Sequence, residues 1–374
     1  MNNLRILSTG SHSHSRKAGL CLSLSAFLCL LSSGADAAGT TYEIKSLRSM
    51  APYIARWQSA ILKKDVARAQ AAAEAYEARW QGLEVYINHR SLPLYRDMEI
   101  DTQFAIDAEL QKEQPDFKLM KKLVIHLNQD LTAAIQMALT GPQLSPLFDD
   151  LDKLRSLRGS TLLVIRDKLG ATEPDIAAAK AAYAAFKKGL PAVNALISFR
   201  STEALADIQS AVASADSLFA DPNATVEQLK AAYSIVNTSY GYGVNLLNAA
   251  ARTSLLSKTA LTDADKNNLT KLNQIKVALA AGSASAGDTG VSSSFAGLQS
   301  TLEGLGRSIN AVGTLRVALL AYNNAVQTTP SDTVAIAKAQ KSALQAVALT
   351  EQALVGQFWG TTDLKSFLAS LPSS

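Results

Sequence analysis

Apolar residues recur every three or four positions along almost the whole chain, and this period is the strongest constraint on its fold. Between residues 49 and 89, for example, Ile54, Trp57 and Ile61 share one apolar stripe. Apolar residues at this spacing line one face of an α-helix. Alanine and leucine, both strong helix formers, dominate the same segments. The sequence therefore predicts an all-α protein.

Capping and breaking residues divide this pattern into separate helices. Pro93 and the pair Gly141-Pro142 interrupt it, and Ser145-Pro146 restarts it as an N-cap and first helical residue. Thr225 with Gln228 resembles a capping box, and Thr262 is a natural N-cap. Helices are expected over about 49–89, 94–111, 117–139, 146–169, 175–191, 203–219, 225–252, from 262 onward, 295–327 and 333–358.

Short turns between these segments favour antiparallel helical bundles built from up-and-down hairpins. Residues 38–374 exceed the roughly 250–300 residues at which one core stops growing, so we expect two packed bundles. We predict a main bundle domain over residues 38–256 and a C-terminal helical domain over residues 257–374. The Gly/Ser/Ala stretch at residues 282–294 has no periodicity and is expected to be a flexible loop in the second domain.

The first 37 residues are typical of a signal peptide. Arg5, Arg16 and Lys17 form a basic region, and an apolar run over residues 18–31 follows. That run is shorter than the roughly 20 residues needed to span a bilayer. Ala35 and Ala37 then fit the small-residue pattern read by a signal peptidase. We predict cleavage after Ala37 and a soluble periplasmic or secreted protein.

The composition excludes several kinds of chemistry. The only cysteines, Cys21 and Cys29, lie in the predicted leader, so the exported chain has no disulfide and no thiolate site. The formal net charge is only +4, which argues against a nucleic-acid partner. Hydrolase, P-loop and dinucleotide-binding motifs are absent from the sequence. We therefore expect a protein that is not an enzyme.

Two glutamates interrupt apolar stripes on either side of the predicted turn at residues 89–93. Glu84 follows Trp80 by four residues, and Glu99 follows Tyr95 by four. Both glutamates lie roughly 8–9 Å along the helix axis from the turn, at matching heights on facing helices. Facing carboxylates inside a bundle suit a hard or borderline cation. The spacing thus favours Glu84 and Glu99 as metal ligands, with Asp149 and His89 as weaker candidates.

A structural explanation of the same glutamates stays open. Arg158 also lies on an apolar stripe, between Leu154 and Leu162, and a buried arginine requires a carboxylate partner. An ion pair between Arg158 and either glutamate would fix helix register without binding anything. Asp149 lies near a helix N-terminus, where acidic groups favour the helix dipole, and a histidine at a turn, such as His89, is more often a solvated residue than a ligand.

The residue pattern also resembles a known family. The run from Ala75 to Glu84, containing Trp80, and the run from Tyr95 to Glu99 are similar to the extracytoplasmic helical region that precedes the membrane part of bacterial high-affinity iron permeases. Further similar residues are Phe148, Asp149, Asp150, Leu151, Arg155, Arg158, the run from Tyr240 to Val244, Asn248 and Arg252. The resemblance covers about residues 51–252.

This resemblance implies a periplasmic role in capturing iron or delivering it to a membrane permease. Trp80, Glu84, Tyr95, Glu99, Asp149 and Arg158 would be the matching positions. The chain departs from the family because no membrane bundle with an iron motif follows, and it lacks the His-x-x-Glu pair of the related exported imelysin-like proteins. Transport by this chain alone is therefore not expected.

The preferred hypothesis is a periplasmic helical-bundle protein that binds a metal ion, iron being the expected one, or assists an iron-uptake system. The main alternative is an envelope interaction or scaffold protein whose buried Glu–Arg network is structural. A third hypothesis is a small-molecule binder that uses the faces of Trp80 and Tyr95.

Overall fold

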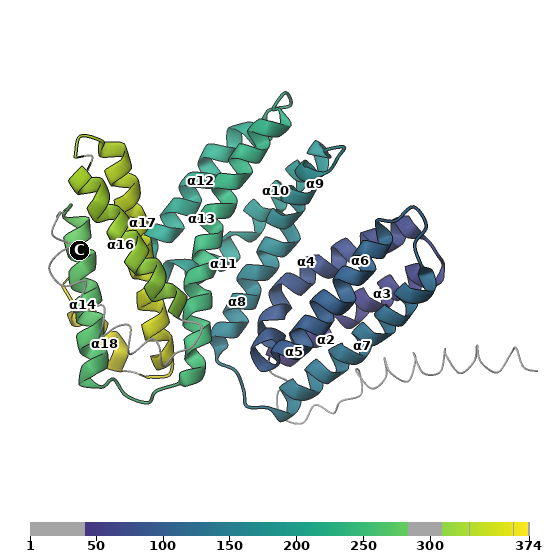
Figure 1. The fold of residues 1–374 in the computed structure, drawn as a ribbon, viewed down its shortest axis with the longest axis horizontal. Coiled ribbons are helices and arrows are strands. Elements are labelled where there is room, and N and C mark those ends of the chain that lie inside the picture. Colours follow the sequence, from purple (N-terminus) through teal and green to yellow (C-terminus); the bar gives the residue numbers. More distant parts are fainter. Residues whose placement is uncertain (1–41, 283–308, 329, 362, 373–374) are drawn as a thin grey trace, which may run out of the picture. The chain divides into compact units, whose positions relative to one another are not determined.

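The computed structural model describes residues 42–282, 309–328, 330–361 and 363–372, and these residues form an all-α protein (Figure 1). The predicted fold class is confirmed. The predicted signal peptide and the predicted flexible loop lie outside the described residues, apart from Gly282. The chain divides into two compact units, formed by residues 1–72 with 100–140 and by residues 73–99 with 141–374. We call them unit 1 and unit 2.

Unit 1 is built around one long helix. α7 (Phe117–Thr140) packs against α2 (Tyr42–Arg48), α3 (Ala51–Leu62) and α6 (Phe104–Leu110). The apolar stripe predicted for the first segment is buried here, since Ile54, Trp57 and Ile61 are each at most 1% exposed. The buried residues of α7 face them at helical spacing, including Leu127 and Leu131.

Most of the remaining helices lie in unit 2, and α13 (Val226–Thr253) is its central element. α4 (Val66–Arg90) begins in unit 1 and continues into unit 2. α13 packs against α8 (Pro146–Leu157), α9 (Leu163–Gly170), α11 (Pro191–Ser198), α12 (Thr202–Ala220) and α17 (Thr333–Val355). Figure 1 shows α12 and α13 side by side. The other helices of unit 2 are α5 (Leu92–Arg96), α10 (Ile176–Gly189), α14 (Asp263–Ala280), α16 (Ile309–Thr328), α18 (Asp363–Ser370) and the short 3₁₀ turns η3 (Ser254–Leu256) and η6 (Gly356–Phe358).

The C-terminal helices of unit 2 form their own hydrophobic cluster. Leu272, Leu319, Val347 and Phe358 belong to it, each buried against the other members. α14 and α16 both pack on α17. The predicted domain boundary at residues 256 and 257 falls at the end of η3, just before this cluster begins, and stays a prediction.

The first predicted helix is wrong in one respect, because residues 49–89 do not form a single helix. α3 ends at Leu62, and α4 (Val66–Arg90) begins after a turn in which Lys64 adopts φ 56°. The Asp65 carboxylate accepts a hydrogen bond from the backbone N–H of Arg68 at 3.0 Å. A short acidic side chain that satisfies a free N–H stabilises a new helix start. This local cap outweighs the continuous apolar period.

Two other predicted helices contain π-helical segments. The helix expected over 94–111 consists of α5, the π segment η1 (Asp97–Gln103) and α6. The helix expected over 146–169 consists of α8, the π segment η2 (Arg158–Leu162) and α9. A π turn holds one residue more than an α turn, so it rotates the side chains that follow. Glu99 and Arg158 both lie in such segments, where α-helical spacing does not fix their direction.

Several predicted helix starts are confirmed. Thr225 and Gln228 form a complete capping box at the start of α13, and Thr262 forms one with Asp265 at the start of α14. Ser145 precedes α8 with Pro146 in its first turn. The Ser145 hydroxyl bonds to Ser254 at 2.5 Å and does not cap the helix, so it joins α8 to η3.

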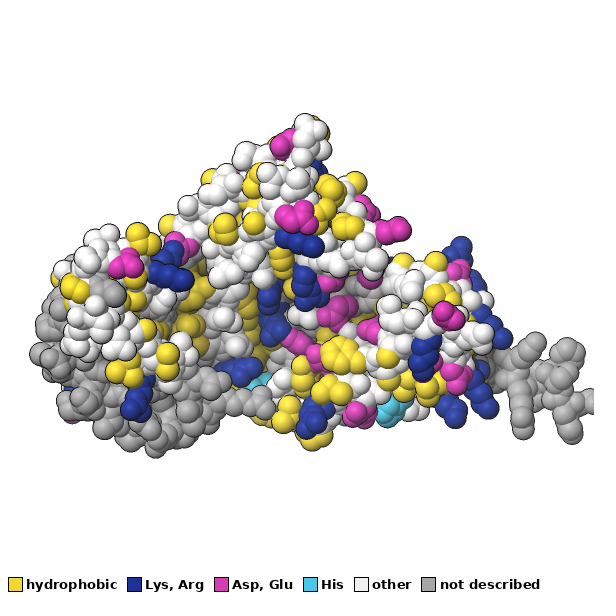
Figure 2. Space-filling model, turned by 45° about the horizontal axis from the view of Figure 1, so that its top comes forward, with side chains coloured by type: hydrophobic (Ala, Val, Ile, Leu, Met, Phe, Trp, Pro, Cys, Tyr) yellow, Lys and Arg dark blue, Asp and Glu magenta, His cyan; other side chains and the backbone are white. Residues whose placement is uncertain are grey.

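Among the described residues, none of the helices combines the length and the apolar character needed to cross a bilayer. On the face drawn in Figure 2, Lys and Arg side chains lie beside Asp and Glu side chains, in agreement with a formal net charge of only +4.

Glu351 on α17 provides a test of electrostatics in unit 2. Burial and the nearby Glu203 raise the pKa of Glu351, while Lys276 opposes the shift. A carboxyl group whose pKa is raised on folding costs no stability below pH about 4.5 and costs more as the pH rises through its folded pKa. Glu351→Gln should therefore raise the melting temperature at pH 7.5 and lose this advantage near pH 4. Glu173→Gln, at an exposed loop position, is the control. An equal effect of Glu351→Gln at both pH values would contradict a raised pKa of Glu351 in the folded protein.

Candidate functional site

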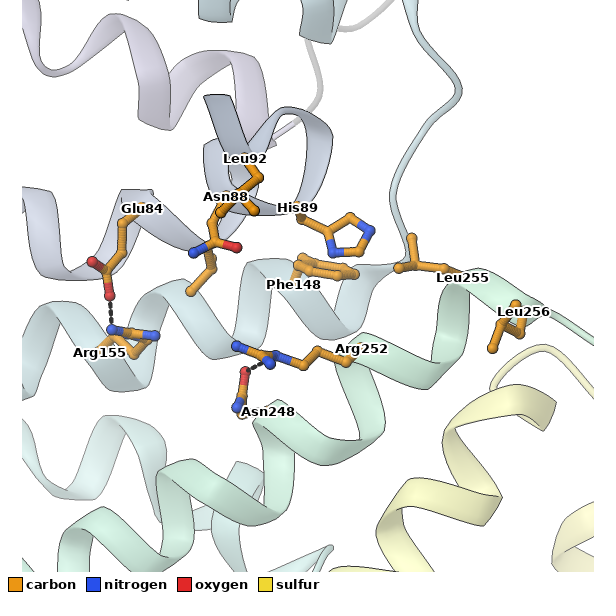
Figure 3. A pocket seen from close by; sticks show the side chains of 11 residues that line it. Glu84, Asn88, His89, Leu92, Phe148, Arg155, Asn248, Arg252, Leu255 and Leu256 are labelled. Carbon is orange, nitrogen blue, oxygen red and sulfur yellow. Dashed lines mark hydrogen bonds and ion pairs between the residues drawn. The ribbon is translucent and has the colours of Figure 1, made fainter. Parts of the chain in front are cut away.

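Unit 2 contains a cavity of about 380 Å³ between α4, α5, α8, α13 and η3. Figure 3 shows its side chains, and we call it the Arg155 cavity. Its volume lies at the small end of the range of about 300–1,000 Å³ typical of ligand sites. The polar residues that line it are Glu84, Asn88, His89, Arg155, Asn248 and Arg252.

Two glycines allow α4 to approach α8 and η2 closely beside this cavity. A Cβ atom on Gly82 would lie 2.1 Å from the Ser156 hydroxyl, and a Cβ atom on Gly159 would lie 2.6 Å from the backbone carbonyl of Ala78. No real Cβ atom comes so close to a neighbour. The glycines therefore set the separation of the two elements that carry Glu84 and Arg155.

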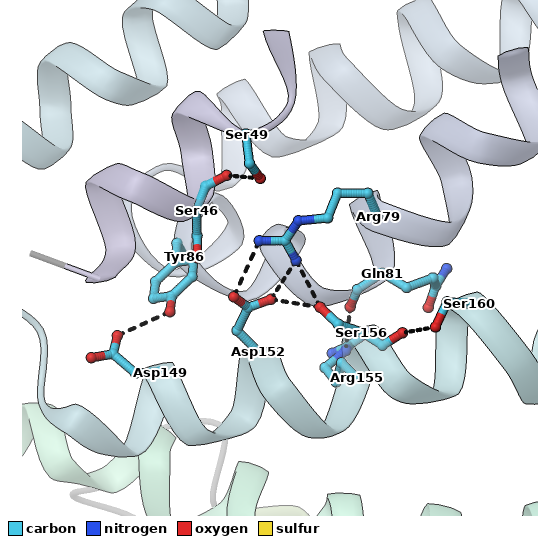
Figure 4. A network of polar contacts seen from close by, with 10 residues as sticks. All are labelled: Ser46, Ser49, Arg79, Gln81, Tyr86, Asp149, Asp152, Arg155, Ser156 and Ser160. Carbon is cyan, nitrogen blue, oxygen red and sulfur yellow. Dashed lines mark hydrogen bonds and ion pairs between the residues drawn. The ribbon is translucent and has the colours of Figure 1, made fainter. Parts of the chain in front are cut away.

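A polar network holds α4 and α8 in register (Figure 4). Arg79 donates to both carboxylate oxygens of the fully buried Asp152, at 2.9 and 3.3 Å, and to the Ser156 hydroxyl at 2.7 Å. Two turns further along α4, the Tyr86 hydroxyl donates to Asp149 at 2.9 Å. A two-point arginine–carboxylate contact fixes orientation as well as distance. The cavity thus has a rigid wall.

Glu84 and Arg155 form an ion pair at one end of the cavity (Figure 3). The side chains are only 10% and 23% exposed. Arg155 also donates from Nε to the backbone carbonyl of Gln81 at 2.8 Å. The pKa of Arg155 is lowered to about 10, first by burial and then by the positive charges of Arg158 and Arg252. The Glu84 carboxylate therefore lies in a region that has an excess of positive charge.

Arg252 supplies a second guanidinium to the cavity. Its Nε donates to Asn248 at 3.2 Å, and in Figure 3 the guanidinium points toward Arg155. The cavity lining contains two guanidinium groups, one carboxylate and the imidazole of His89. The amide groups of Asn88 and Asn248 add neutral hydrogen-bonding groups. The polar end of the cavity therefore suits a negatively charged group.

The other end of the cavity is apolar. The His89 ring packs on the buried Phe148 ring at 5.0 Å between centroids. Three leucines of the lining are unusually exposed for their size, with 40% for Leu92, 39% for Leu255 and 45% for Leu256.

Glu99 lies elsewhere in unit 2, near Tyr95 and Trp80. The rings of Trp80 and Tyr95 stack with an interplanar angle of 7° and 6.3 Å between centroids. Burial raises the pKa of Glu99, and the negative charge of Glu77 raises it further, while a hydrogen bond from Tyr95 opposes the shift. The Oε2 atom of Glu99 is buried and has no hydrogen-bond partner among the described residues.

The four predicted metal ligands do not form one cluster, and they contact different residues. Among the described residues, no three of Glu84, Glu99, Asp149 and His89 bring their ligand atoms within 4.8 Å of one another. Glu84 and His89 line the Arg155 cavity, Asp149 accepts from Tyr86, and Glu99 lies beside Tyr95. The role of all four residues as metal ligands stays a prediction.

The predicted ion pair of Arg158 with Glu84 or Glu99 is wrong, because a different arginine pairs with Glu84. Arg158 donates to Asn237 at 3.1 Å, and Glu84 pairs with Arg155, one turn earlier on α8. Arg155 is the last residue but two of α8, whereas Arg158 begins η2, where the π turn redirects the side chain. Arg155, Asn248 and Arg252 are already part of the family resemblance, but their spacing along the sequence does not indicate that they share a cavity.

The protein is all-α and has a small cavity in unit 2 with one polar end. No protein-family model matches the chain, and neither a curated protein nor a solved structure matches it. The resemblance to the extracytoplasmic region of iron permeases therefore stays a prediction.

Proposed function

We propose that this protein is a binding protein, not an enzyme, and that unit 2 binds a small anion in the Arg155 cavity. The observation that carries the proposal is the pair of guanidinium groups, Arg155 and Arg252, at one end of a cavity of about 380 Å³. Guanidinium groups recognise carboxylates and phosphates through paired hydrogen bonds.

The electrostatics of Arg155 support this function. Burial and two neighbouring guanidinium groups destabilise its charged form, which is why its pKa is lowered. A bound anion would offset both effects, and its interaction would be stronger in the partly buried cavity than in water. An anion bound beside Arg155 and Arg252 would interact favourably with both guanidinium groups of the lining.

We expect Arg252→Gln to weaken anion binding at least tenfold, because a charge-assisted hydrogen bond contributes roughly 1.5–3 kcal/mol. The measurement is isothermal titration of the purified protein with acetate, hexanoate and inorganic phosphate. Arg166→Gln is the matched control, since Arg166 is 55% exposed in its side chain and lies outside the cavity lining. Circular dichroism should show both variants folded. If none of the three anions binds, or if Arg252→Gln binds them as the unchanged protein does, the proposed function is wrong.

The second candidate function is cation binding at Glu99, and the buried Oε2 atom of Glu99 favours it. A cation would compensate the charge repulsion between Glu99 and Glu77 and the burial that raises the pKa of Glu99. Carboxylate and phenol oxygens are hard ligands, and hard cations prefer oxygen ligands. Iron is the expected metal on the basis of the family resemblance, and the role would be delivery to a membrane permease outside the cytoplasm.

Variants of Glu99 and Glu84 distinguish cation binding at Glu99 from a purely structural role of these glutamates. In titrations with ferrous, ferric, zinc and copper ions, Glu99→Gln should abolish binding. Glu84→Gln should leave metal binding unchanged because Glu84 is held by Arg155. Loss of metal binding in Glu84→Gln alone would instead support Glu84 as a ligand. A folded protein that binds none of these ions would exclude this candidate.

A further inference from the structure

We propose that the ligand of the Arg155 cavity is an amphiphilic carboxylate, which consists of one negatively charged group and a short apolar body. This inference rests on the proposed anion-binding function. It adds the chemical class of the ligand and its orientation: the carboxylate at Arg155 and Arg252, the apolar body over Phe148, Leu255 and Leu256.

The polar and apolar groups are separated within the cavity. Figure 3 shows Glu84, Arg155 and the guanidinium of Arg252 toward one end, and Leu255 and Leu256 toward the other. A purely inorganic anion would contact only the first end. A purely apolar molecule would contact only the second end and would form no hydrogen bond with either guanidinium group.

The exposed leucines supply the second, independent observation. Leu92 lies at the start of α5, and Leu255 and Leu256 lie in η3. Each of these lining residues leaves about two fifths of its surface in contact with solvent. Apolar surface of this kind is favourably removed from water by an apolar ligand. Leu255 and Leu256 lie in the 3₁₀ turn η3, which follows Arg252 by only a few residues. The charged and apolar groups of the site are therefore fixed to one another by the chain itself.

The cavity volume limits the size of the apolar body. A volume of about 380 Å³ suits a small ligand and is insufficient for a long-chain lipid. Phe148 is 1% exposed and packs against the tilted His89 ring, so its position is fixed by its surroundings where it lines the cavity.

The test compares three probes by isothermal titration with the purified protein: acetate has the charge alone, hexan-1-ol the apolar body alone, and hexanoate both. A buried methylene strengthens binding about fourfold. We therefore expect hexanoate to bind at least tenfold more tightly than acetate, and at least tenfold more tightly than hexan-1-ol. Inorganic phosphate is the fourth probe, and it should bind no more tightly than acetate.

Variants of the protein then identify which end of the cavity binds the carboxylate and which end binds the apolar body. Leu255→Ser should reduce hexanoate affinity at least threefold and leave acetate affinity unchanged, whereas Arg252→Gln should weaken both. Leu320→Ser is the matched control, because Leu320 is 53% exposed on α16 and does not line the cavity. Leu256→Ser is a second rim variant in case Leu255→Ser does not fold.

The outcomes separate this inference from the function on which it rests. If acetate or phosphate binds as tightly as hexanoate and the binding depends on Arg252, the anion site stands and the amphiphilic ligand is excluded. If no anion binds a folded protein, both proposals fail. If hexan-1-ol binds as tightly as hexanoate, the guanidinium groups do not select the ligand, and both proposals are again overturned.

Discussion

Replacing Gly356 with alanine is expected to lower the free energy of unfolding by about 3 kcal/mol or more. Gly356 begins η6, and a Cβ atom there would lie 2.2 Å from the backbone carbonyl oxygen of Ala250 and 2.2 Å from the Thr253 hydroxyl. Both neighbours belong to α13, the central helix of unit 2. Backbone atoms of a packed helix cannot move aside as a flexible side chain can, so the two elements must separate. Urea denaturation followed by circular dichroism measures the loss.

Two other glycines provide controls for this prediction. A Cβ atom on Gly360, four residues further along, would meet nothing within 4 Å, and the same holds for Gly241 within α13. Gly360→Ala should change stability by no more than about 0.5 kcal/mol. Gly241→Ala should increase it by about 0.5–1 kcal/mol, because alanine is the better helix former. An unchanged denaturation midpoint for Gly356→Ala would show that α13 and η6 are not in such close contact.

Removing Arg155 is expected to cost about 2–4 kcal/mol, since it leaves the Glu84 carboxylate, whose side chain is only 10% exposed, without its ion-pair partner. Arg155→Gln and Glu84→Gln should each destabilise unit 2. The double variant should lose clearly less than the sum of the single losses, because neither buried charge is then left alone. The difference, about 1–3 kcal/mol, is the coupling energy of the pair.

The exposed pair Arg166–Asp167 is the control for this cycle. Its side chains are 55% and 57% exposed, and a solvated ion pair contributes less than about 1 kcal/mol. Its coupling energy should be under about 0.5 kcal/mol. Additive effects of Arg155→Gln and Glu84→Gln would show that the two side chains do not interact in solution, and the cavity electrostatics would require revision.

Local sequence signals predict much of the secondary structure. The capping boxes at Thr225 and Thr262 involve residues three positions apart, so the sequence contains both partners. The split at Lys64 is missed because neither glycine nor proline marks it, and the only available signal is the capping ability of Asp65. The π segments are missed because an apolar period of three and four residues does not distinguish a π turn from an α turn.

The candidate site depends on contacts between residues that are far apart in the sequence. Residue spacing along one helix does not predict such contacts. Glu84 and Arg155 lie on different helices, and their meeting depends on the approach of α4 to α8 at Gly82 and Gly159. The same limit applies to the two glycines of Tyr240–Gly243, because a glycine within a helix does not by itself show whether a neighbouring element approaches it closely. A Cβ atom on Gly241 would meet nothing within 4 Å, so Gly241 is not required by packing.

The π segment η2 also has a consequence for how this chain tolerates changes of length. A π turn equals a one-residue insertion into an α-helix, accommodated without breaking the helix. Deleting one residue from Arg158–Leu162 would restore a continuous α-helix and leave α9 in nearly its present rotation relative to α8, because the π turn already absorbs the extra residue. The same deletion within the regular α-helical part of α9 would rotate the residues that follow by about 100° about the helix axis. The buried Leu169 would then turn away from α10 and α13, which α9 contacts. A change of one residue in length should therefore be tolerated best within η2.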